Sequence, residues 1–300
     1  MDNSKVAFRD YLQLEKKYSL HTVNAYLQDV GLFEAYVYTA FEQDDLCEVH
    51  YSQIRGWIVS LVDDGISNAS INRKIASLKA YYKFLLKIKQ VQVSPLLQHK
   101  SLKTPKLLQI PFSENELKRV FDAIEYGDDF EGVRDRLIID LFYTTGIRRS
   151  ELIGIKMGNV DFSNSTLKVL GKRNKERIVP LLPIVLKAFE LYLSKRVRLE
   201  SIVDGEYFFL TSKGVKLGES LVYRLINKYF SVVSEKVKRS PHVLRHTFAT
   251  HLLNNGANLN SVKDLLGHAS LASTQIYTHT TLSELKKVCF ESHPRNNNNN

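Results

Sequence analysis

The chain has 300 residues, of which 44% are hydrophobic and 25% charged, and Lys and Arg outnumber Asp and Glu by 42 to 32. No window contains the roughly 18 consecutive apolar residues that a membrane-spanning helix needs, and two cysteines are too few for a disulfide framework or a four-cysteine metal site. The composition therefore predicts a reduced, cytoplasmic, two-domain protein without a membrane span. Its surplus of ten positive charges favours a polyanionic partner such as nucleic acid.

The first hundred residues predict helices, because their apolar positions recur at spacings of three and four. The clearest helix covers residues 70–87. Three of its basic residues, Arg73, Lys74 and Lys79, lie beside or opposite the apolar stripe and are candidates for contacts with a DNA backbone. The alternative interpretation is an ordinary solvated face, which is the commoner origin of such a pattern. The predicted buried stripe consists of Ile71, Ile75, Leu78, Tyr82 and Leu85.

Residues 95–112 are predicted to form a linker, because Pro95, Pro105 and Pro111 interrupt any helix there. The expected divisions are a helical amino-terminal domain at 1–94, this linker, a second domain at 113–290 and a tail at 291–300. The tail ends in five asparagines, which have neither the apolar content nor the charge pattern to support a fold. We therefore expect it to be disordered.

The second domain combines helices with a small sheet. An apolar run at 137–142 predicts a helix that is buried on most sides. Two strand-like runs at 166–170 and 177–179 are separated by a basic stretch, which predicts a β-hairpin with a basic tip. The fold class predicted for the chain is therefore mainly α, with an α+β second domain after a helical first one.

The segment 240–256 predicts an anion site at the start of a helix. Ser240 can cap this helix, and Pro241 suits its first turn. His242 and Arg245 are three residues apart, so they project from one side of the first turns, where free backbone N–H groups favour an anion. The planar fork of Arg245 can hold two phosphate oxygens, and His242 can add a hydrogen bond or carry a proton.

Other candidates depend on their combination. Arg148 stands just before a predicted helix start, where it is well placed for phosphate, and Glu151 can hold its guanidinium by a charge-assisted bond. A purely structural ion pair is the alternative. His268 follows a glycine that ends a short predicted helix, and Tyr277 comes nine residues later. Taken singly, His268 is more often a capping or core residue and Tyr277 a packing aromatic.

Two competing motifs are absent from the sequence. Gly171 and Lys172 are followed by Arg173 and do not complete a nucleotide-binding P-loop. The histidines of segment 240–256 lack a His-Glu-x-x-His pattern or a cysteine pair, and the neighbouring arginine would repel a cation. Neither a nucleotide nor a metal ion is expected.

Four ordered motifs resemble the signature boxes of the tyrosine recombinases, also called phage integrases: TGIRRSEL, GKRNKERIVPL, HVLRHTFATHLLNNGANLNSVKDLLGH and TQIYTH. Two amino-terminal runs, SLHTVNAYLQDV and SINRKIASLKAYYKFL, resemble the core-binding, SAM-like domain of that family. The run HPR at 293–295 resembles the tail of its Xer group. The intervals also look Xer-like: 24 residues from Arg148 to Lys172, 3 from His242 to Arg245, 23 on to His268 and 9 on to Tyr277.

The resemblance implies a role for each matching position. The implied roles are Tyr277 as nucleophile, Arg148 and Arg245 as phosphate-clamping arginines, Lys172 as hairpin lysine and proton donor, His242 and His268 as the two histidines, and Glu151 as supporting acid. One position departs from the family, because Arg173 stands where related sequences usually have glycine.

The implied function is site-specific recombination, in which DNA strands are cut and rejoined through a 3′-phosphotyrosyl intermediate without metal, cofactor or ATP. A two-domain, C-shaped clamp on double-stranded DNA is implied, with four protomers on two duplexes and the last helix, around 283–288, docked on a neighbouring protomer. The tetramer is either homomeric or shared with a paralogous recombinase, and a DNA translocase is a further candidate partner.

Chromosome dimer resolution is the expected biological role. The alternatives are a mobile-element integrase, a non-catalytic DNA-binding protein on this scaffold, and a type IB topoisomerase-like enzyme.

Overall fold

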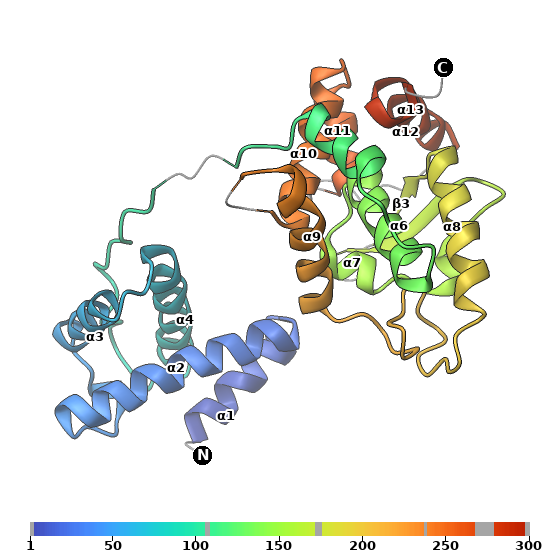
Figure 1. The fold of residues 1–300 in the computed structure, drawn as a ribbon. Coiled ribbons are helices and arrows are strands. Elements are labelled where there is room, and N and C mark those ends of the chain that lie inside the picture. The colour runs from blue at the N-terminus through green and yellow to red at the C-terminus, as the bar shows by residue number, and fades with distance from the viewer. Residues whose placement is uncertain (1–2, 106–108, 172–175, 237–238, 268–278, 298–300) are drawn as a thin grey trace. The chain divides into compact units, whose positions relative to one another are not determined.

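The computed structural model of the chain describes residues 3–105, 109–171, 176–236, 239–267 and 279–297. Contacts between Cα atoms divide the chain into two compact units, residues 1–107 and 108–300, which are described separately below (Figure 1). Within the described residues, no helix is both long enough and apolar enough to span a bilayer.

The first unit is helical. Its helices are α1 (Asn3–Asp10), α2 (Leu20–Phe41), α3 (Tyr51–Asp63) and α4 (Asn68–Lys87), with a π-helical turn at Tyr11–Glu15 and a 3-10 turn at Leu46–Glu48. The predicted apolar stripe of α4 is confirmed, since all five of its side chains are buried in the core of this unit. Arg73 and Lys79 are exposed on the same helix, and Lys74 is half-buried.

Part of the segment predicted as a linker packs against α4. Leu96 is buried in the core of the first unit. The side-chain amide of Asn72 donates to the carbonyl of Leu102 and accepts from its N–H, both at 2.9 Å. The prolines prevent a helix here, so the backbone groups of Leu102 need other hydrogen-bond partners. The side-chain amide of Asn72 supplies both. The boundaries of the linker and of the two domains stay a prediction.

The second unit surrounds a small sheet with helices. Its helices are α5 (Glu114–Lys118), α6 (Phe130–Thr145), α7 (Arg149–Ile153), α8 (Pro183–Arg196), α9 (Glu219–Val233), α10 (Pro241–Asn254), α11 (Leu259–Leu266), α12 (His279–Ser292) and α13 (Pro294–Asn297), with shorter turns at Arg119–Ala123 and Met157–Asn159. Strands β1 (Val160–Asp161), β2 (Thr166–Leu170) and β3 (Glu176–Pro180) form an antiparallel sheet in the order β1-β2-β3. The predicted fold class and the pairing of the two predicted strands are confirmed, whereas β1 is an additional strand. The predicted basic tip at 172–175 lies outside the described residues.

Helix α6 forms the centre of this unit, with α8 and α10 packed against it (Figure 1). Its apolar run at 137–142 is buried as predicted. The helix ends at Gly146, whose φ of 58° lies in the left-handed region that favours glycine. A Cβ at this position would approach the ring of Phe248 on α10 to 2.4 Å. Gly146 therefore permits the turn that precedes Arg148. It also permits the close approach of α10 to the end of α6.

The expectation of a disordered tail is wrong for residues 291–297. His293 is fully buried, and its Nε2 donates to the carbonyl of Tyr143 at 3.0 Å. Nε of Arg295 donates to Oδ1 of the buried Asp140 at 3.1 Å. Composition missed this anchor because it depends on two polar side chains that meet partners on α6, about 150 residues earlier in the chain.

Helix α12 packs on its own chain in this structure. Leu285 and Cys289 are buried in one apolar cluster with residues of α10 and α11. The docking of this helix on a neighbouring protomer, which the resemblance implies, is therefore a proposal about an assembled state.

Replacing Arg295 by Met should lower the free energy of unfolding of the second unit by roughly 3 kcal/mol, because it leaves the buried carboxylate of Asp140 without its cation. Urea unfolding of the full chain, followed by circular dichroism, measures this change. Lys287→Ala is the control, since Lys287 and Glu291 form an exposed pair at 4.0 Å whose loss should cost less than about 0.5 kcal/mol. Equal losses in the two variants would contradict the anchoring role.

Candidate active site

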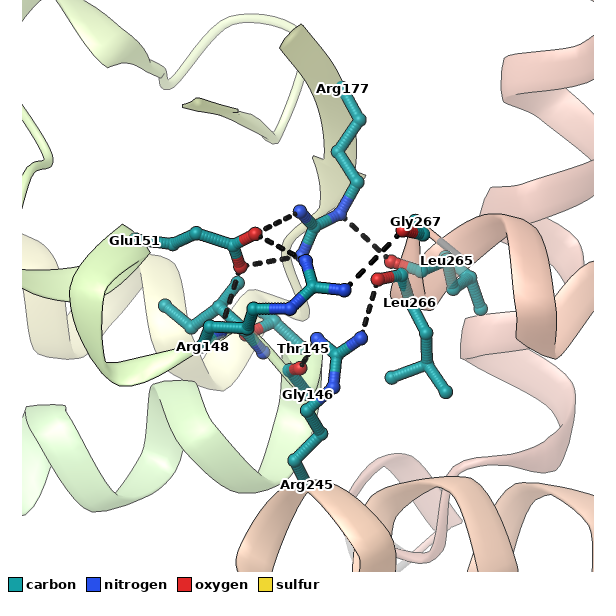
Figure 2. A network of polar contacts seen from close by, with 10 residues as sticks. Thr145, Gly146, Arg148, Glu151, Arg177, Arg245, Leu265, Leu266 and Gly267 are labelled. Carbon is teal, nitrogen blue, oxygen red and sulfur yellow. Dashed lines mark hydrogen bonds and ion pairs between the residues drawn. The ribbon is translucent and has the colours of Figure 1, made fainter. Parts of the chain in front are cut away.

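A buried carboxylate, that of Glu151 on α7, lies at the centre of the site. Its two oxygens accept four hydrogen bonds (Figure 2). The backbone N–H of Arg148 donates to Oε2 at 2.7 Å and its Nη1 donates to Oε1 at 2.7 Å. Nη1 of Arg177 donates to Oε1 at 2.6 Å and Nη2 to Oε2 at 2.9 Å. The predicted ion pair of Arg148 and Glu151 is thus present, and Arg177 on β3 completes it.

Burial of Glu151 alone would raise the pKa of its carboxyl group. The hydrogen bonds and charge of Arg177, followed by the hydrogen bonds from Arg148, outweigh this effect and lower the pKa to about 2. The carboxylate is therefore ionised throughout the neutral range.

Arg245 brings a third guanidinium to the same place. It is 7% exposed, and its Nη1 and Nη2 donate to the carbonyls of Gly146 and Leu266, the latter at 2.6 Å. Burial, and then the charges of Arg148 and Arg177, lower the pKa of Arg245 to about 10, so it stays protonated at neutral pH. Three guanidinium groups against one carboxylate leave two uncompensated positive charges, which favours an anion (Figure 2).

The cluster opens into a pocket of about 470 Å³ in the second unit, whose lining includes Arg148, His242 and Arg245. The side chain of Arg148 is 30% exposed, and His242 is exposed on the first turn of α10. Pro241 occupies the first turn of this helix as predicted, although the side chain of Ser240 makes no capping hydrogen bond. Three of the six predicted catalytic residues are thus gathered around one pocket, beside the first turn of α10, where the positive end of the helix dipole favours an anion.

The other three, Lys172, His268 and Tyr277, lie outside the described residues, as does Arg173. Their roles stay predictions. Among the described residues, no three His, Cys, Asp or Glu side chains are grouped as metal ligands would be.

Arg177 was not singled out from the sequence, although a signal existed. It is two residues before the buried Val179 on β3, and side chains at this spacing share one face of a strand. An arginine that faces a core needs a carboxylate partner, and Glu151 was already a candidate. Combining the strand pattern with Glu151 would have predicted the ion pair of Arg177 and Glu151.

The first unit contains a similar arrangement around Asp29, which is 1% exposed. Arg73 donates to both of its oxygens, at 2.7 and 3.0 Å, and Lys74 donates at 3.3 Å. Ser77 completes the set with a bond of 2.7 Å. The side chain of Arg73 remains 53% exposed, and Lys79 donates to a backbone carbonyl at 3.3 Å. The structure groups Arg73 with Lys74 and leaves their contact with DNA as a prediction.

Comparisons with known proteins match both units. The model of the phage integrase family covers residues 111–284, and the model of the phage integrase N-terminal SAM-like domain covers residues 6–89. The tyrosine recombinase XerC of Oceanobacillus iheyensis is 38% identical over 295 residues, which cover 97% of this chain and 96% of that protein. XerC of Staphylococcus saprophyticus is 36% identical and covers 98% of both chains.

Solved structures agree in fold. The XerH site-specific recombinase bound to a palindromic difH substrate is 23% identical, with a TM-score of 0.67 and coverage of 95% of this chain and 84% of that one. The integrase of transposon Tn1549 in complex with circular intermediate DNA is 20% identical, with a TM-score of 0.70 and coverage of 94% and 98%.

A SAM-like helical domain followed by an α+β domain with clustered arginines defines the class as a two-domain DNA recombinase. The chain belongs to the phage integrase family and is a Xer-like, site-specific tyrosine recombinase.

The stability of the second unit should depend on pH through Glu151. Its pKa in the folded chain is about 2, below the ordinary value of 4.5, so its contribution is complete above pH 5 and is lost as the pH falls toward 2. We expect Glu151→Gln to lower the free energy of unfolding by about 3 kcal/mol at pH 7. Urea titrations at several pH values should show the gap between wild type and variant narrowing on acidification. A gap that stays constant down to pH 3 would contradict this linkage.

Proposed function

We propose that this recombinase breaks and rejoins DNA through a covalent bond between Tyr277 and a 3′-phosphate. The observation that carries the proposal is the convergence of Arg148 and Arg245 on one pocket, with His242 at its edge. Two guanidinium forks can neutralise the negative charge that a pentacoordinate phosphate develops, which is the task that metal ions perform in many nucleases.

The reaction is an exchange of esters. The hydroxyl oxygen of Tyr277 forms a bond to phosphorus while the bond to the 5′ oxygen breaks. His242 assists removal of the phenol proton, since a tyrosine hydroxyl with a pKa near 10 is otherwise a weak nucleophile. Lys172 delivers a proton to the leaving 5′ oxygen, and His268 hydrogen-bonds a non-bridging oxygen or helps to place the tyrosine.

Rejoining reverses these steps. The 3′-phosphotyrosyl ester keeps the energy of the original bond, so the 5′ hydroxyl of a second strand can displace Tyr277 without ATP. This conservation of bond energy is what makes recombination, and not hydrolysis, the outcome. The chemistry requires neither a metal nor an organic cofactor.

The assembly that we propose is a C-shaped clamp, with the helical domain on one face of the duplex and the catalytic domain on the other. Four protomers on two duplexes, homomeric or shared with a paralogous recombinase, carry out one exchange. We propose a cytoplasmic role in chromosome dimer resolution, as the resemblance to the Xer group implies, with mobile-element integration as the alternative and a DNA translocase as a candidate regulator.

A nicked suicide substrate tests the nucleophile. We expect the wild-type chain to form a covalent adduct with DNA that peptide mapping assigns to Tyr277. Tyr277→Phe should abolish the adduct while DNA affinity is kept, because only the attacking oxygen is removed. An adduct on another residue, or an adduct that persists in the Phe variant, would overturn the assignment.

The charges on α4 test the DNA contact of the first unit. Arg73→Gln should weaken binding to all DNA sequences about equally and reduce the salt dependence by about one counterion, as expected for a phosphate contact. Filter binding or fluorescence anisotropy at several salt concentrations measures both quantities. Lys83→Gln, on the same helix but without an observed bond to Asp29, is the matched control for net charge. A salt slope that drops equally in both variants would show that position does not matter.

A further inference from the structure

The buried side chain of Arg177 is held by three hydrogen bonds. Its side chain is 6% exposed, and its guanidinium is used on both edges. Nη1 and Nη2 donate to the two oxygens of Glu151, and Nε donates to the carbonyl of Leu265 at 3.1 Å. Figure 2 shows that Arg177 thereby connects β3, the start of α7 and the end of α11. These are segments from three distant parts of the sequence.

The packing around Arg177 confirms that its place is fixed. Gly267, with a φ of 62°, ends α11 directly beside it. A Cβ on Gly267 would approach Cδ of Arg177 to 2.9 Å and Nε to 3.3 Å. The backbone at the end of α11 therefore packs too closely against Arg177 to leave room for a side chain at position 267.

The contacts of Arg177 determine how Arg148 is held. Oε2 of Glu151 accepts from Nη2 of Arg177 and from the backbone N–H of Arg148, and Oε1 accepts from Nη1 of Arg177. The side chain of Arg148 makes a single short bond to this carboxylate, from Nη1 to Oε1. Within the described part of the chain, its Nη2 has one acceptor, the carbonyl of Gly267 at 3.4 Å. The rest of the fork stays available to the pocket that Arg148 lines.

We propose that Arg177 is a positioning residue for DNA cleavage, which keeps the guanidinium of Arg148 free for phosphate by occupying both oxygens of Glu151. The inference rests on the proposed function. Without Arg177, Glu151 can turn both oxygens to Arg148 in a bidentate pair, the strongest arrangement for an arginine and a carboxylate. That pair would use the same parallel N–H groups that a phosphate needs.

The test compares variants by the rate of adduct formation on the nicked substrate, with enzyme in excess and saturating, below the unfolding temperature of every variant. Arg177→Met should lower this rate about 100-fold, as expected when a catalytic group is misplaced, while DNA affinity is unchanged. Arg177→Lys should remain slow, because lysine keeps the charge but cannot bridge both oxygens. Arg177→Gln is a second neutral replacement that keeps polar contacts if the Met variant does not fold.

A double variant separates positioning from general damage. Changing Glu151 to Gln in the Arg177→Met background removes the carboxylate that would capture Arg148. The double variant should therefore cleave faster than Arg177→Met alone. A merely structural role for Arg177 predicts no such recovery in the rate per folded molecule.

Arg134→Met is the matched control. Arg134 is also buried, donates through two nitrogens to Asp135 at 2.7 and 3.0 Å, and bonds the carbonyl of Leu210 at 3.3 Å. It does not line the arginine pocket, so this variant should lose stability but cleave at the wild-type rate. Full activity of Arg177→Met or Arg177→Lys, or no recovery in the double variant, would overturn the positioning role. Failure of the wild-type chain to form any adduct would instead overturn the proposed function itself.

Discussion

The second unit depends on a single buried carboxylate. Glu151 is 4% exposed, yet it is shared by two arginines and a backbone N–H. Burying an ion is costly unless it is paired and fully hydrogen-bonded, and here every acceptor position is used. Strand β3, the turn after α6 and the end of α11 meet at this cluster. The guanidinium groups of Arg148, Arg177 and Arg245 join them by hydrogen bonds to backbone carbonyls. The same hydrogen bonds therefore join segments of the fold and set the geometry of the site.

The first unit contains a similar arrangement, for which we propose a role in contacting DNA. Asp29 is buried and binds the guanidinium of Arg73 in a bidentate pair, yet that side chain stays half exposed. A flexible surface arginine loses side-chain entropy when it binds a phosphate, whereas one already fixed by a carboxylate loses less. In both units, an acid on a neighbouring segment fixes a basic side chain in advance. Part of the positive charge of the chain is thus carried by guanidinium groups whose N–H donors have a fixed direction.

Much of this could be predicted from the sequence because it is local. The buried stripe of α4 follows from helical spacing, the hairpin from alternation, and the pair of Arg148 and Glu151 from a spacing of three at a helix start. What could not be predicted depends on contacts between distant segments. Composition predicted a disordered tail, but His293 and Arg295 find partners on α6. Arg177 is an intermediate case: its place on the buried face of a strand was a readable signal, but its partner is 26 residues away on another element.

The missed arginine, Arg177, matters because of what the proposed chemistry without a metal requires. A metal ion presents its charge to phosphate from a fixed point, whereas guanidinium groups on flexible side chains must be fixed by the protein. Arg245 is fixed by two backbone carbonyls, which cannot compete as anions for its charge. Arg148 is fixed by the carboxylate of Glu151, which can compete with a phosphate for the charge of the guanidinium. In the mechanism that we propose, a second arginine on that carboxylate limits the competition, so three guanidinium groups are needed to offer two to the substrate.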